Sequence, residues 1–221
     1  MINNNLFYTN QMDNSRQVPG TAYIRLFHAA PGAPEVDIYA NGKQIAKRLV
    51  YGQFTDYLAL PVGSYTFEAF PVGLTDSPVL SVTIPIQNNV YTLALIGLLP
   101  KIGILPIVDE FVSISPERAN IRFANLSPNA PNLNLALRGG MNIFTDIGYT
   151  EVSGYTSIRP GLYNFVVTSV TSPATIIVDV PRVRILGRRN LTFYVLGLYG
   201  QQPSSLEVYI PMDGTTFLRS F

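Results

Sequence analysis

The chain has 221 residues, and only 13% of them are charged, about half of the usual share. Fifteen Lys and Arg residues balance fourteen Asp and Glu residues, so the net charge of +1 gives no reason to expect nucleic acid as a partner. The absence of cysteine excludes disulfide bonds, thiolate metal sites and a cysteine nucleophile. A surface so poor in charge tends to associate, which points toward contacts between copies of the chain.

Residues 1–20 form an N-terminal arm that is rich in asparagine and carries one short apolar, β-prone stretch at Leu6, Phe7, Tyr8 and Thr9. The arm lacks the basic and apolar regions of a Sec signal peptide, so we expect any export to use another route. Such a composition is typical of a disordered tail. The alternative is an assembly arm whose strand adds to an open sheet edge of another copy through main-chain hydrogen bonds.

Residues 21–115 carry the pattern of an antiparallel β-sandwich. Runs rich in Val, Ile, Thr, Tyr and Phe are separated at short intervals by Gly, Pro and Asn. The pair Asn41 and Gly42 lies between two such runs and predicts a two-residue hairpin turn, because both turn positions need a positive φ.

Residues 90–108 are the most membrane-like part of the chain, with Lys101 as their single charge. Two prolines and two glycines in this segment would break a spanning helix. We therefore expect no membrane span here, and instead two buried strands joined around Pro100.

Residues 116–221 repeat the first half. Segment 24–34 aligns with segment 121–131 at an offset of 97, and later matches follow at offsets of 98 and 100, as small loop insertions produce. The recurring polar pairs include Arg25 and Arg122, Tyr57 and Tyr155, and Thr92 and Thr192. The sequence therefore predicts two tandem all-β domains, residues 21–115 and 116–221, that meet near Ile114–Arg118.

The stretch HAAPGAPEVDIYANG, followed by YLALPVGSYTFEAFPVG, resembles a bacterial domain-of-unknown-function family whose members read HASPDAPAVDVYVNG and then LPAGTYTVEV. The resemblance covers residues 21 to about 213 and is stronger in the first repeat. It implies tandem Ig-like or transthyretin-like sandwiches on cell surfaces and in spore-formers, with no established catalytic residues. The missing signal peptide departs from many members and favours release from a lysed mother cell.

The single histidine, His28, lies inside this motif, and Asp37 follows it beyond the turn at Pro31–Pro34, where a hydrogen bond between the two is sterically feasible. In the second repeat the same positions hold Asn125 and Asn134. Asparagine can form a hydrogen bond but cannot shuttle protons near neutral pH or supply imidazole ligation. We therefore interpret these four residues as a structural latch that holds the turn. A ligand contact and a metal or catalytic role are the alternatives.

The sequence lacks the motifs of serine hydrolases, zinc proteases, P-loop proteins and zinc fingers. Carboxylate pairs for glycoside hydrolysis could form among six acidic residues, but nothing in their spacing selects a pair. These residues are Glu35, Asp37, Asp56, Glu68, Asp109 and Glu110. We expect no enzyme, no catalytic residue, no metal and no cofactor.

A basic run near the C-terminal end holds Arg182, Arg184, Arg188 and Arg189. Arg182 and Arg184 alternate with apolar residues, so we expect both on one face of a strand. The simpler interpretation is a solvated edge strand whose charges discourage indiscriminate pairing. The other is a docking patch for an acidic glycan or an acidic neighbouring subunit.

Together these patterns predict a non-enzymatic structural protein, a self-assembling subunit of an extracellular or spore-surface fibre or layer. Its expected partners are copies of itself, and also cell- or spore-surface components, but not nucleic acid. The alternative is an adhesin-like module that binds glycan or another surface ligand through loops at one end of the sandwiches.

Overall fold

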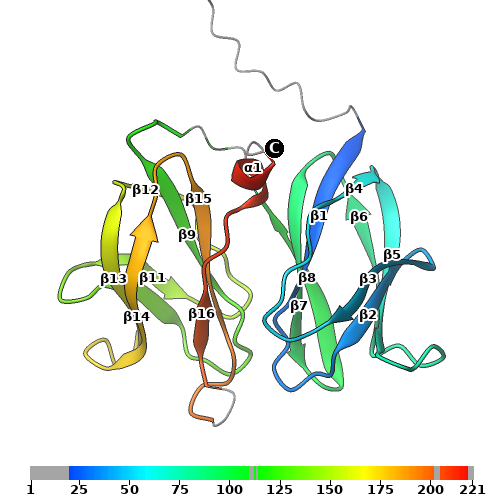
Figure 1. Cartoon of the computed structure of the whole chain (residues 1–221). Coiled ribbons are helices and arrows are strands. Elements are labelled where there is room, and N and C mark those ends of the chain that lie inside the picture. Colours follow the sequence, from blue (N-terminus) through cyan, green and yellow to red (C-terminus); the bar gives the residue numbers. More distant parts are fainter. Residues whose placement is uncertain (1–19, 110–111, 113, 202–204, 219–221) are drawn as a thin grey trace, which may run out of the picture.

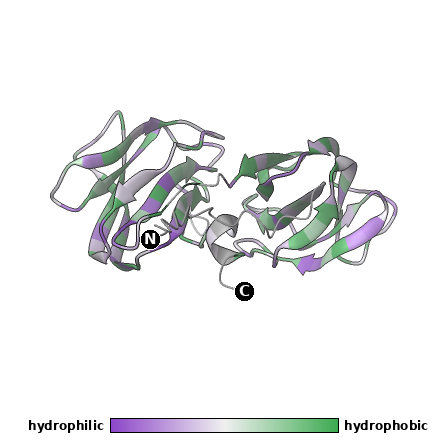
Figure 2. Cartoon of the chain, turned by 90° about the horizontal axis from the view of Figure 1, so that it is seen from above, coloured by the Kyte–Doolittle hydropathy of each residue, from purple (hydrophilic) through white to green (hydrophobic). Residues whose placement is uncertain are grey.

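The computed structural model describes residues 20–109, 112, 114–201 and 205–218. These residues form two β-sandwiches that lie side by side (Figure 1), and seen from above they make two lobes (Figure 2). The predicted all-β tandem architecture is confirmed. The predicted assembly arm, with Leu6, Phe7, Tyr8 and Thr9, lies outside the described residues.

The first sandwich contains two four-stranded sheets. Its inner sheet, which faces the second sandwich, has the order β4 (Leu58–Pro61), β1 (Thr21–His28), β7 (Val90–Leu98) and β8 (Lys101–Val108). Its outer sheet has the order β3 (Lys43–Leu49), β2 (Val36–Ala40), β5 (Gly63–Pro71) and β6 (Leu80–Ile86). The sequence pattern indicated antiparallel sheets, and all neighbouring strands are antiparallel except β1 and β7, which pair in parallel.

The second sandwich repeats this strand order. Its inner sheet has the order β12 (Thr156–Ile158), β9 (Ala119–Asn125), β15 (Asn190–Leu196) and β16 (Glu207–Tyr209). Its outer sheet has the order β11 (Asn142–Ile147), β10 (Leu133–Leu137), β13 (Gly161–Ser169) and β14 (Ile176–Ile185). The pair β9 and β15 is again parallel. A short helix, α1 (Gly214–Phe217), follows the last strand.

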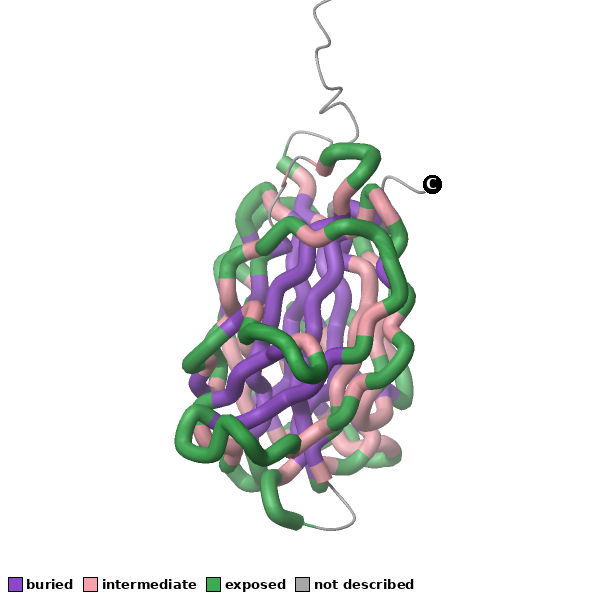
Figure 3. Tube along the Cα trace, turned by 90° about the vertical axis from the view of Figure 1, so that its left-hand side faces the viewer, coloured by how far each residue is buried: buried purple, intermediate pink, exposed green. Residues whose placement is uncertain are grey.

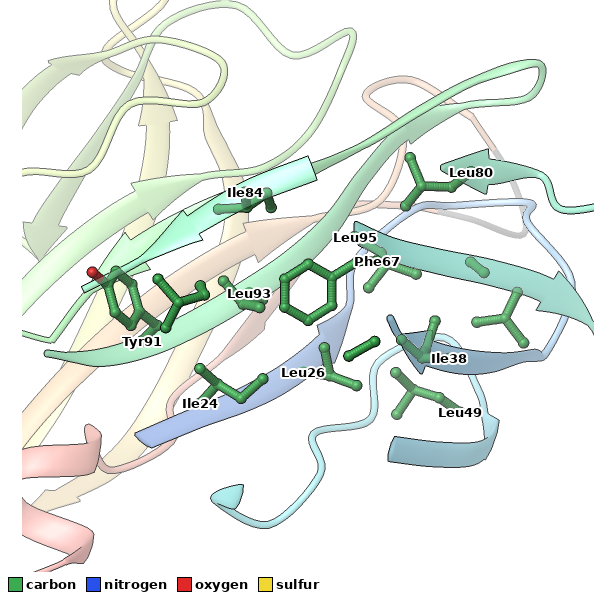
Figure 4. Close-up of a cluster of buried hydrophobic side chains, with 14 of the residues drawn as sticks. Ile24, Leu26, Ile38, Leu49, Phe67, Leu80, Ile84, Tyr91, Leu93 and Leu95 are labelled. Carbon is green, nitrogen blue, oxygen red and sulfur yellow. The ribbon is translucent and has the colours of Figure 1, made fainter. Parts of the chain in front are cut away.

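The central strands of both inner sheets, β1 and β7 in the first and β9 and β15 in the second, are buried on both faces, which explains their nearly continuous apolar sequences. Along β1, Ile24 and Leu26 pack into the core of the first sandwich (Figure 4), whereas the next residue, Phe27, packs toward the second sandwich. The buried positions therefore follow the inner strands along their length (Figure 3).

A third apolar cluster joins the two sandwiches. Phe27 from β1 and Tyr194 from β15 approach across the junction, with ring centroids 5.3 Å apart. The buried members of this cluster are Phe27, Ala29, Ala94, Ile96, Ile107, Ala124, Leu126, Tyr194 and Leu196. Because residues of both inner sheets share one buried cluster, the junction is a packed interface.

Two local predictions from the sequence are confirmed, except that most of the second strand of segment 90–108 is not buried. Asn41 and Gly42 have φ values of 49° and 75° and connect β2 to β3 as a two-residue turn. Segment 90–108 forms the two strands β7 and β8, which are joined at Leu99–Pro100; β7 is buried, while most of β8 is only partly buried. No helix among the described residues is long and apolar enough to cross a membrane.

Candidate functional site

Four charged side chains, two from each sandwich, are buried at the junction. Arg25 lies on β1 and Arg122 on β9, while Asp109 and Asp213 follow the last strands of the two inner sheets. Each arginine alternates with core residues along its strand, so it points away from its own core and toward the other sandwich. We call this cluster, together with its tyrosine and threonine partners, the joint.

Arg122 reaches from the second sandwich into the first. Its Nε donates a hydrogen bond to Thr192 Oγ1 at 2.7 Å, and its Nη1 donates to the carbonyl of Val108 at 2.8 Å. Its Nη2 donates to the carboxylate of Asp109. A buried guanidinium that finds an opposite charge and two further acceptors is well compensated for its lost hydration.

Arg25 makes the equivalent contacts from the first sandwich into the second. Its Nε donates to Thr92 Oγ1 at 2.9 Å, and its Nη1 donates to the carbonyl of Met212 at 2.8 Å. Its Nη2 lies 3.5 Å from Asp213 Oδ1, which is an ion pair without a hydrogen bond. The two repeats thus exchange matching arginine contacts, and the joint has approximate twofold symmetry.

One tyrosine from each sandwich completes the joint. The hydroxyl of Tyr57 donates to Asp109 at 2.8 Å, and that of Tyr155 donates to Asp213. Their rings lie 5.0 Å from the guanidinium of Arg25 and 4.7 Å from that of Arg122, respectively. Burial and the neighbouring carboxylates raise the pKa of both phenols, so both stay protonated and donate.

Asp213 is a fully buried carboxylate whose pKa is shifted by its surroundings. Burial, with Asp109 nearby, raises its pKa to about 6, and the two arginines oppose this rise. The hydroxyl of Thr192 lies 2.8 Å from both of its oxygens. A hollow of about 280 Å³ opens beside Arg25. Nearly all polar atoms of the joint have partners within it, so its buried charges are largely compensated by one another.

His28 is fully buried, and its Nε2 lies 3.1 Å from the carbonyl of Pro34, at the end of the predicted turn. Asp37 accepts instead from the backbone N–H of Arg48 at 2.7 Å. The hydrogen bond between His28 and Asp37 that the sequence suggested is not formed, because the residues lie in opposite sheets and bind different partners.

The corresponding asparagines also bind backbone. Asn125 donates to the carbonyl of Ile147 at 3.2 Å, and Asn134 accepts from the backbone N–H of Asp146 at 3.0 Å. Asp37 and Asn134 thus bind equivalent backbone N–H groups, those of Arg48 and Asp146, which have φ values of 50° and 61°. Each of these four side chains contacts backbone, and their role as a latch stays a prediction.

The basic run lies along β14, an edge strand, and the loop that follows it. Arg182 and Arg184 are exposed, while Ile185 is buried. Arg182 has a φ of 56° and forms a bulge opposite Asn164, whose side chain accepts its backbone N–H. Arg188 and Arg189 belong to the turn between β14 and β15.

The carboxylate candidates from the sequence have different surroundings in the structure. Asp109 belongs to the joint, Glu35 pairs with Arg48 at the surface, and Glu110 lies outside the described residues. Within the described part of the chain, no three His, Asp or Glu residues gather as a metal site would require.

Sequence reasoning did not identify the joint as a site. The signal was present, since arginine, tyrosine and threonine recur in both repeats while most neighbouring residues differ. The two aspartates follow the last strands and are offset by 104 residues, outside the alignment that revealed the repeat.

The model of a family described as a domain of unknown function, DUF4397, matches residues 22–136, just over half of the chain. The chain belongs to the DUF4397 family. The match covers the strands of the first sandwich and continues into β10 of the second. The expected membership of a family of unknown function is thus confirmed, whereas a comparison with curated proteins finds no match.

Two solved structures are similar to this DUF4397 protein. The Bacillus anthracis TIE protein shares 13% identity with a TM-score of 0.23, over 79% of this chain and 33% of that one. A family 26 carbohydrate-binding module of Eubacterium rectale Amy13K, solved with maltoheptaose, shares 9% identity with a TM-score of 0.27, over 88% and 99%. The chain thus spans about a third of the length of the TIE protein. Similarity at this level carries no argument about function.

Proposed function

We propose that this protein is a non-enzymatic structural subunit of an extracellular or spore-surface fibre or layer. The observation that carries the proposal is the joint, where Arg25, Arg122, Asp109 and Asp213 bind one another across the two sandwiches. Buried charges are costly, and here they hold two domains in one arrangement. A block of fixed geometry is what a repeating assembly needs from its subunit.

The outer sheets offer open edges for the contact between subunits. Strand β14 has ten residues and, among the strands of the described residues, pairs only with β13. In its first half, Ile176 is 43% exposed, and the charge of Asp179 is paired with Arg138. A register shift at Ile177 also disturbs the first half. Pro181 and the bulge at Arg182 interrupt the strand more strongly, so residues 176–180 are the longest stretch that can accept an added strand.

The assembly arm is the proposed donor. Its root is at Gly20, whose carbonyl accepts the backbone N–H of Val62 at 2.7 Å. The fourteen residues from Gly20 back to Leu6 can span at most about 50 Å, enough to reach a neighbouring copy. An arm at one place and an acceptor at another make a heterologous contact, which propagates into a filament unless it closes into a ring.

The test compares the full chain with a variant that lacks residues 1–19 and with a full-length variant carrying Leu6→Ser, Phe7→Ser and Tyr8→Ser. We expect regular polymers only from the unchanged chain, measured by light scattering after size exclusion and by negative-stain electron microscopy. Circular dichroism checks that both variants remain folded. Polymers of the same form from either variant would contradict the arm mechanism.

The second candidate is an adhesin-like module that binds glycan or another surface ligand through loops at one end of the sandwiches. The observation that favours it is an open hollow of about 580 Å³ at an end of the second sandwich. This candidate predicts a 24.3 kDa monomer of the unchanged chain in the same experiment.

A further inference from the structure

One end of the second sandwich, the upper end in Figure 1, carries four arginines that form no ion pair with any carboxylate of the described residues. Three loops meet there: residues 115–118, 159–160 and 186–189. The backbone N–H of Arg188 donates to the carbonyl of Arg118 at 2.8 Å, which ties the third loop to the first. We call this surface the arginine end; its arginines are Arg118, Arg159, Arg188 and Arg189.

The hollow of about 580 Å³ lies between the first two loops of the arginine end. Its lining residues are Ser115, Glu117, Arg118, Arg159 and Pro160. The third loop passes directly beside it, because a Cβ placed on Gly187 would lie 2.6 Å from the carbonyl oxygen of Pro116 and 3.4 Å from the ring of Pro160. The positive charge therefore extends from the hollow along the neighbouring turn.

The fold itself does not require these charges, as the first sandwich demonstrates. There the backbone N–H of Tyr23 donates to the carbonyl of Asn89, just as that of Asn120 donates to Arg189. The strand pair that leads to Arg118 and Arg159 likewise has its counterpart in β1 and β4. The corresponding residues of the first sandwich are uncharged: Thr21, Pro61, Asn88 and Asn89.

We propose that the arginine end binds an acidic polysaccharide whose sugars carry carboxylates. The guanidinium of Arg159 is exposed and can pair with a carboxylate through two hydrogen bonds, while Arg118 supplies further positive charge. Ser115 and Glu117 offer a hydroxyl donor and a carboxylate acceptor to sugar hydroxyls. Arg188 and Arg189 can hold further units of the same polymer, which adds avidity.

The lining of the hollow favours a sugar over a nucleic acid. It contains no aromatic side chain on which bases could stack. Arg159 and Arg188 are exposed and Arg118 and Arg189 are partly buried, so each ion pair with a ligand is weak on its own and is screened by salt.

The site does not depend on the proposed assembly, because it includes neither the arm nor the first half of β14.

The test measures binding of fluorescently labelled polygalacturonate to the full chain by anisotropy, with uncharged dextran as the neutral polymer. The variant carries Arg159→Gln, Arg188→Asn and Arg189→Asn, the last two taken from the first repeat. Arg118 is left in place because its Nε and Nη2 donate to Ser157. The matched control carries Lys43→Gln, Lys47→Gln and Lys101→Gln, three exposed lysines of the first sandwich with the same loss of charge.

We expect the arginine variant to bind polygalacturonate at least about tenfold more weakly, and the lysine variant to stay within about twofold of the unchanged chain. Equal loss in both variants would overturn the proposal, because it would show an effect of net charge alone. Equal binding of dextran, or of duplex DNA at the same salt concentration, would also overturn it. Arg159→Glu alone serves as the second variant if the triple one unfolds. The chain without residues 1–19 should bind as the full chain does, which separates this test from that of assembly.

Discussion

His28 is a buried histidine without a charged partner among the described residues. Burial lowers its pKa below the usual 6.5, and the contact with the carbonyl of Pro34 opposes this only in part. Its Nδ1 has no hydrogen-bond partner, so the neutral ring donates from Nε2 to Pro34. In the second repeat Asn125 stands at this position and donates to Ile147 without any titration.

Replacing His28 by asparagine should therefore remove a pH dependence of stability. Since the folded-state pKa is lowered, the unfolded chain binds more protons, and the unchanged protein loses stability as the pH falls through about 6.5. The loss is at most about 1.4 kcal/mol per pH unit. Urea unfolding of both proteins between pH 5 and pH 8 checks this. The difference between their free energies of unfolding removes the contributions of the titratable groups that the two proteins share. A difference that is independent of pH would show that His28 is not buried in its neutral form.

For single residues, the sequence predicted which positions recur in the two repeats better than it predicted which side chains contact one another. Alignment of the two repeats brought out Arg25, Tyr57 and Thr92 with their counterparts. It could not show that Arg25 reaches Asp213, because that contact depends on how the two sandwiches face each other. The expected hydrogen bond between His28 and Asp37 is not formed for a related reason. Proximity along the chain does not determine which of the two sheets a residue enters.

The strands themselves were largely predictable, because turn residues and alternation are local signals. The hairpin at Asn41 and Gly42 and the division of segment 90–108 into β7 and β8 both follow from such signals. The parallel pairing of β1 with β7 does not, since the side-chain pattern of a strand is the same for either direction of its neighbour. The burial of β1 and β7 on both faces also depends on the second sandwich, which covers the face that points away from their own core.

The turn between β7 and β8 gives a test at the level of an element. Gly97 has a φ of 96°, and a Cβ at this position would lie 2.4 Å from the carbonyl oxygen of Lys101. Gly103, which lies on β8 opposite Ile96, has no atom within 4 Å of such a Cβ. We expect Gly97→Ala to lower the free energy of unfolding by about 2 kcal/mol or more, from strain and collision together.

The matched substitution Gly103→Ala should change the free energy of unfolding by less than about 1 kcal/mol, because its backbone and surroundings accept a methyl group. Chemical denaturation of the two variants provides the comparison. Similar losses in both would show that the turn does not depend on the left-handed conformation of Gly97.

The joint and the apolar cluster around Phe27 and Tyr194 hold the two sandwiches together. Both sandwiches contribute buried charges whose partners lie in the other sandwich, so separation of the two would expose an unpaired arginine on each side. Unfolding of one sandwich should therefore destabilise the other. The proposed role as a fixed building block rests on this coupling, whatever the ends of the block bind.

Differential scanning calorimetry of the full chain tests this coupling most directly. We expect one transition, with the van't Hoff enthalpy close to the calorimetric enthalpy, because the two sandwiches unfold together. The variant Arg25→Met with Arg122→Met should unfold at a lower temperature and in two steps, since the polar half of the interface is lost. Two resolved transitions in the unchanged protein would contradict the account, because they would show that the sandwiches are stable independently and that the joint does not hold them as one block.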